Sequence, residues 1–130
     1  MEQLRKALEA RDAVAVEALL ADDVVFRSPA LFKPYAGRAA TMVFLRAAME
    51  TFEDFRYVQT YADDGGRAHV LMFAASVGGR ELEGADFITL DESGLVSEFR
   101  VMIRPMSGLI ALAEAMSPRV ESGMTTLNPG

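Results

Sequence analysis

Three short turns, each containing glycine, divide the second half of the chain and constrain its fold more than any other feature. The turns lie at 63–66, 78–79 and 91–94, and strand-like runs cover 55–62, 67–77, 81–90 and 95–104. Turns of this kind between strand-like runs are typical of β-hairpins. We therefore expect a four-stranded antiparallel meander, which ends at Pro105 because proline cannot donate to a sheet ladder.

Helical periodicity dominates the first half of the chain. Apolar residues repeat at helical spacing in two short segments, with Asp12 as the expected N-cap of the second. A short strand at 24–28 must end at Pro29. Residues 38–52 contain no helix breaker and are apolar nearly all round, which predicts a buried helix.

These elements predict one α+β domain, residues 1–116, with helices packed over a curved sheet. A further helix at 108–116 closes the domain, and the polar tail 117–130 has little to bury, so we expect it to be flexible. A chain of 130 residues can bury a core without metal or disulfide staples. Cysteine is absent, which excludes thiol nucleophiles, disulfides and cysteine-ligated metals.

The charge balance excludes polyanionic partners. The net charge is −6, and no window holds the clustered lysine and arginine that track phosphates. The charged start of the chain does not resemble a signal peptide, and no apolar run approaches the roughly 20 residues that span a bilayer. We therefore expect a cytoplasmic protein that binds neither nucleic acid nor membrane.

One carboxylate, Asp86, is expected on an apolar strand face. Alternation along 81–90 places it with Leu82 and Ile88, and alternation along 95–104 places Arg100 and Arg104 on the opposite face. Burial without a basic partner should raise the pKa of the carboxyl group. Asp86 is therefore the main candidate for acid–base chemistry, although a hydrogen-bonded structural acid fits the same pattern.

His69 is the single histidine of the chain and shares strand parity with Leu71 and Phe73. It could share a cavity with Asp86, but one histidine cannot build a typical zinc site, and we predict no metal. The strand that carries it is apolar on both faces, while helices can cover only one of them. A homodimer that covers the second face is the natural expectation.

The order of these elements resembles the nuclear transport factor two-like superfamily, which includes SnoaL-like polyketide cyclases, ketosteroid isomerases and limonene epoxide hydrolases. The residues that carry the resemblance are 21–26, Ser28-Pro29, Gly37, 86–96 and Arg104-Pro105. The resemblance covers Leu4 to about Met116. It implies a cystatin-like cone: a curved mixed or antiparallel sheet, wrapped by N-terminal helices and one long helix, with a ligand pocket at its open mouth.

Carried over residue by residue, the isomerase pattern is incomplete. The resemblance implies an aspartate base where this chain has Ser28, and a tyrosine near Leu4, so only Asp86 matches, as the protonated acid. The epoxide hydrolase pattern needs an arginine beside its aspartates. Strand alternation places both candidate arginines, Arg100 and Arg104, on the face opposite Asp86. SnoaL-like cyclases, which use one pocket acid and sometimes a histidine, fit Asp86 and His69 best.

The pocket is expected to hold a small apolar molecule without any cofactor. Its predicted walls are Phe26, Ser28, Tyr35, Tyr57, Leu71, Phe73, Ile88, Phe99, Val101 and Ile103. Two hypotheses of function remain open. The domain is either a metal-independent isomerase, cyclase or hydratase, though not a true ketosteroid isomerase, or a non-catalytic module for ligand binding or dimeric interaction.

Overall fold

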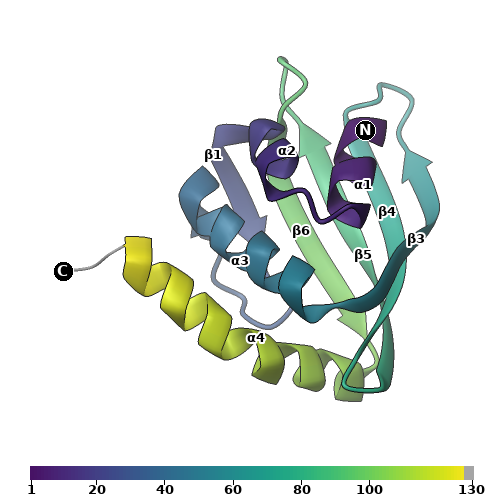
Figure 1. Cartoon of the computed structure of the whole chain (residues 1–130). Helices are drawn as coiled ribbons and strands as arrows, with labels where there is room; N and C mark the ends of the chain where they lie inside the picture. The colour runs from purple at the N-terminus through teal and green to yellow at the C-terminus, as the bar shows by residue number, and fades with distance from the viewer. Residues whose placement is uncertain (128–130) are drawn as a thin grey trace.

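Helices cover one face of a six-stranded sheet in the computed structural model, which describes residues 1–127 (Figure 1). The helices are α1 (Glu2–Glu9), α2 (Ala13–Ala18), α3 (Arg38–Thr51) and α4 (Met106–Leu127). The strands are β1 (Leu20–Arg27), β2 (Tyr35–Ala36), β3 (Glu53–Ala62), β4 (Ala68–Val77), β5 (Arg80–Leu90) and β6 (Val96–Arg104). The predicted α+β class and the four-stranded meander are confirmed.

The sheet is mixed because the first strand returns beside the last. Its order is β2-β1-β6-β5-β4-β3, in which β1 runs parallel to β6 and the other neighbours are antiparallel. β1 begins earlier than the sequence predicted and includes Asp22 and Asp23. The two aspartates are exposed and lie where the register with β6 shifts, between Leu20 and Val25, so the strand tolerates them.

α3 is the buried helix that the sequence predicts. Eight of its residues are buried, including two threonines. The Thr41 hydroxyl donates to Gly37 O at 2.8 Å, and the Thr51 hydroxyl donates to Ala47 O at 2.6 Å. Both buried hydroxyls are therefore satisfied within the helix.

α4 extends to Leu127, well beyond the end predicted at Met116. Gly123 makes this possible, because a Cβ atom there would lie 2.7 Å from a methyl carbon of Val43. Because Gly123 has no side chain, α4 packs closely on α3. Arg119 Nε of α4 lies 3.3 Å from Glu50 Oε2 of α3. The segment that we expected to be a flexible tail is thus helical up to 127, and residues 128–130 lie outside the described part of the chain.

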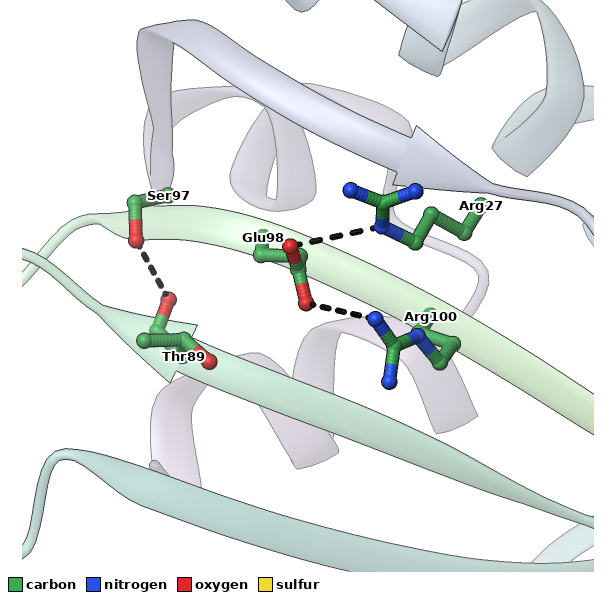
Figure 2. A network of polar contacts seen from close by, with 5 residues as sticks. All are labelled: Arg27, Thr89, Ser97, Glu98 and Arg100. Atoms are coloured by element: carbon green, nitrogen blue, oxygen red, sulfur yellow. Dashed lines mark hydrogen bonds and ion pairs between the residues drawn. The ribbon is translucent and has the colours of Figure 1, made fainter. Parts of the chain in front are cut away.

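The predicted faces of β5 and β6 are confirmed where they matter for the site. Asp86 pairs with Leu71 on one side and with Val101 on the other, on the face that the helices cover. Arg100 lies on the other face, where Glu98 bridges it to Arg27 (Figure 2). Parity fails only near 96, where a register shift buries Val96.

None of the helices described within residues 1–127 is both long enough and apolar enough to cross a membrane.

Candidate functional site

The site is a cavity of about 70 Å³ at the seam between two clusters of the hydrophobic core. One cluster lies under α1, α2 and α3, and the other lies between the far end of the sheet and α4. Tyr57, Val101 and Met116 pack against both clusters and also line the cavity. The core therefore does not close completely, and the remaining space lies over the middle of the sheet.

Asp86 reaches this cavity from β5 and is paired with Tyr57 of β3. Only 5% of Asp86 is exposed. The Tyr57 hydroxyl donates a hydrogen bond of 2.5 Å to Asp86 Oδ2. Oδ1 accepts no hydrogen bond from any group of residues 1–127. The carboxyl group thus has one oxygen held by the protein and one oxygen available to a ligand.

Burial dominates the electrostatics of this pair. Desolvation raises the pKa of Asp86 to about 7, against the smaller opposing effect of the Tyr57 hydrogen bond. Burial and the neighbouring carboxyl group raise the pKa of Tyr57 well above its usual value. Tyr57 therefore stays protonated as a donor, while Asp86 exists in both protonation states near neutral pH.

The raised pKa of Asp86 predicts a specific dependence of stability on pH. An aspartate in the unfolded chain titrates at its ordinary pKa of 3.8, whereas Asp86 titrates at about 7 in the fold, so the folded state holds the extra proton between these values. Its contribution favours folding at low pH and is lost as pH rises towards 7. The free energy of unfolding of the wild type, minus that of Asp86→Asn, should fall by roughly 2–3 kcal/mol between pH 5 and pH 8.

Urea denaturation of both proteins at pH 5 and pH 8 measures this difference. The pH dependence of stability that arises from all other titratable groups is the same in both proteins and cancels in the difference. An unchanged difference would mean that Asp86 is already ionised at pH 5 and is not desolvated.

Six of the ten predicted wall residues line the cavity: Phe26, Tyr57, Phe73, Phe99, Val101 and Ile103. Ser28 and Tyr35 instead line a neighbouring cavity beside α4. Leu71 and Ile88 face the correct side of the sheet but are buried in the first core cluster, which also contains Leu4, Ala7 and Leu8 of α1.

His69 does not line the cavity with Asp86. Its position in β4 is paired with Ala62 and Ile88, at the end of the sheet next to the β3–β4 turn. The ring Nε2 lies 2.8 Å from Gly66 O within that turn. The prediction that His69 shares the cavity of Asp86 is therefore wrong: shared strand parity fixed its face but not its position along the strand.

Several functional positions are missed by sequence reasoning. Tyr57 was predicted only as a wall, although its hydroxyl is the partner of Asp86. Most of the remaining lining residues come from helices: Leu8, Phe44, Leu45, Ala48, Met49, Leu112 and Met116. Arg11 lies in the turn between α1 and α2, Phe52 follows α3, Phe55 lies on β3, and Pro29 lies in the loop after β1. The buried character of 38–52 signalled that α3 faces the core, but not which of its residues border a void.

Arg11 is the cationic residue of the lining and adopts a left-handed conformation with φ of 57°. Its Nη2 donates to Phe52 O at 2.7 Å and so completes the end of α3. Desolvation and the Tyr57 hydrogen bond account for the shift in the pKa of Asp86, so Arg11 does not hold that carboxyl group in its ionised form. Within residues 1–127, no group of three acidic or histidine side chains gathers to hold a metal.

The profile of the SnoaL-like domain matches residues 1–99. The chain belongs to the SnoaL-like domain family. The structure of a steroid delta-isomerase from Pseudomonas aeruginosa is 43% identical, with a TM-score of 0.89, over 95% of this chain and 90% of that chain. No protein of curated function matches the sequence significantly.

Two further structures extend the relationship of this SnoaL-like domain. A protein with a cystatin-like fold from Silicibacter pomeroyi is 32% identical, with a TM-score of 0.91, over 98% of this chain and 89% of that one. An NTF2-like protein from Cytophaga hutchinsonii is 17% identical, with a TM-score of 0.63, over 82% of this chain and 88% of that one, and shows the shared fold alone. The predicted cystatin-like architecture is confirmed.

Proposed function

We propose that this SnoaL-like domain binds a small apolar carbonyl compound and catalyses a cofactor-independent proton transfer on it, with Asp86 as general acid and base. The observation that carries the proposal is the environment of Asp86. Its carboxyl group is buried in an aromatic and aliphatic cavity, its pKa is about 7, and Tyr57 is its hydrogen-bond partner. A group that titrates near the working pH is suited to accepting and returning a proton.

One carboxyl group suffices for an isomerisation. The ionised form of Asp86 accepts a proton from the carbon beside the carbonyl, which leaves an enolate and a neutral acid. The neutral acid then returns the proton to another carbon of the conjugated enolate, so that a double bond moves with no change in charge or oxidation state. Tyr57 stabilises the carboxylate through its bond to Oδ2.

The relative from Pseudomonas aeruginosa is described as a steroid delta-isomerase, which supports a reaction of this class. In this chain Ser28 stands where the resemblance places a separate base, and it lies outside the Asp86 cavity. We therefore propose that Asp86 performs both proton transfers on a compound other than a true ketosteroid isomerase substrate. The alternative, non-catalytic binding, keeps the same cavity and predicts no conversion.

A small β,γ-unsaturated ketone tests the proposal. We expect the protein to convert 3-cyclohexen-1-one to 2-cyclohexen-1-one faster than buffer does, followed by the ultraviolet absorbance of the conjugated product. Binding, detected as a rise in melting temperature, without conversion would favour the non-catalytic alternative. The absence of both binding and conversion would contradict the proposal.

We also propose that the chain forms a homodimer through the outer face of the sheet. Met72, Ala85 and Met102 lie side by side there in register, and 53% of Met102 is exposed. Charged residues of both signs border this apolar row, including the ion pair of Arg104 Nη1 with Glu83 Oε1 at 2.8 Å. Such a mixed border can meet its own copy around a two-fold axis.

Sedimentation velocity tests the dimer with matched variants. We expect a dimer for the wild type, a shift towards monomer for Met102→Glu because two added charges would be buried, and no shift for Val14→Glu, which changes an exposed valine on α2. A monomeric wild type at 100 µM would contradict the proposal.

A further inference from the structure

A second cavity, of about 270 Å³, lies beside the Asp86 cavity. It is bordered by α4 and by the end of β1 with the loop that follows. Five residues line both spaces: Phe26, Pro29, Phe44, Leu112 and Met116. These shared side chains form the partition between the inner and the outer cavity.

Most of the partition is fixed by packing. The rings of Phe26 and Phe44 are stacked with their centroids 5.3 Å apart, and both residues are buried, as is Leu112. Met116 differs because it is only half-buried and its unbranched side chain has three rotatable bonds. Met116 is thus the part of the partition that can move without disturbing the core.

The volumes show what the two spaces can hold. The inner cavity of about 70 Å³ is much smaller than the roughly 300–1,000 Å³ of typical small-molecule sites. The outer cavity of about 270 Å³ supplies most of the missing space. Only a ligand that enters both cavities can therefore bring a sizeable apolar body to Asp86.

The outer lining indicates the character of the distal part of the ligand. It is mainly apolar, with Leu109, Ala113 and Val120 of α4 contributing, and its exposed polar members are Ser117 and Glu121. The Glu121 carboxylate disfavours an anionic tail. The outer cavity thus fits an uncharged hydrocarbon segment that ends close to solvent.

We infer that the inner and outer cavities are two lobes of one ligand site, divided by Met116, and that its ligand is an extended, uncharged apolar carbonyl compound. The carbonyl end occupies the inner lobe at Asp86, and the hydrocarbon body displaces the Met116 side chain and fills the outer lobe. The inference rests on the proposed function for the chemistry of the inner lobe and adds the length and charge of the ligand.

The affinities of two methyl ketones, 2-pentanone and 2-nonanone, test the inference in titrations followed by NMR. Their lengths differ by four methylenes, each worth about a fourfold gain when buried. We expect 2-nonanone to bind the wild type on the order of 100-fold more tightly. Ala113→Leu fills the outer lobe alone, so it should reduce this gain to below about tenfold and leave 2-pentanone unchanged.

Two variants secure the interpretation. Ser117→Leu changes an exposed residue of the outer lobe and should act like Ala113→Leu without risk to the core. Ala18→Leu changes an exposed alanine on α2 and should have no effect. Equal affinities for the two ketones, an equal loss for both ketones in the outer-lobe variants, or no binding of either ketone would overturn the inference.

The isomerisation of 3-cyclohexen-1-one, a compact ring without an extended hydrocarbon tail, distinguishes the two proposals. Isomerisation without a gain with ketone length overturns only the two-lobed site. A gain with ketone length that the outer-lobe variants remove, without isomerisation, overturns only the proposed function.

Discussion

Replacing Asp86 with asparagine should lower the rate of ketone isomerisation by about 10²–10⁴-fold, the usual contribution of a general acid–base group. Asparagine has nearly the same shape and can still accept the hydrogen bond of Tyr57 through its amide oxygen. It cannot take up or return the transferred proton. The affinity for the ketone should change by no more than a few-fold, so the loss should fall on the rate constant of the bound complex.

Glu83→Gln is the matched control for this substitution. Glu83 lies on the same strand, on the outer face, where it pairs with Arg104. The same carboxylate-to-amide change there should leave the rate within twofold. If Asp86→Asn retains wild-type activity, the proton transfer is carried by another group or by solvent.

Phe73→Ala should lower the free energy of unfolding by about 3–5 kcal/mol, as is typical of truncating a buried phenylalanine. Phe73 is 1% exposed, and its ring contacts the rings of Phe52, Phe55 and Tyr57. Gly84 leaves the space for this ring, because a Cβ atom at position 84 would lie 2.5 Å from Phe73 Cζ. The neighbouring side chains cannot readily fill the void, since Phe73 already borders the Asp86 cavity and has few atoms on that side to take its place.

Urea denaturation at pH 7 measures this loss, and Phe32→Ala is its control. Phe32 is fully exposed in the loop after β1, so its truncation should change stability by less than about 0.5 kcal/mol. A loss below 1 kcal/mol for Phe73→Ala would mean that the aromatic wall collapses into the cavity and is not a rigid support of the site.

The fold was predictable because local signals agree with one another. The glycine turns fixed the hairpins, strand alternation placed Asp86 inside, and the same alternation placed Arg100 outside. The continuation of α4 was not predictable from its polarity. It depends on the contact of Gly123 with Val43, which joins positions far apart in the sequence.

The site was predictable only in part, for a related reason. Alternation assigns a face to a residue but not a position along the sheet. His69 therefore shares its face with Asp86 yet lies at the start of β4, beside the β3–β4 turn. Tyr57 lies on the next strand but one from Asp86, and its hydroxyl reaches across the face of β4. Contacts of this kind follow from the curvature of the sheet, which the sequence pattern does not encode.

The most direct test is a titration of the Asp86 carboxyl carbon, followed by carbon-13 NMR of selectively labelled protein and assigned with Asp86→Asn. A carboxyl group sheltered from water and cations, with Tyr57 as its donor, should titrate with a pKa of about 7. A pKa of about 4, the ordinary value for aspartate, would show that water or a cation reaches the group. It would then be ionised at neutral pH, and the acid–base account would be contradicted.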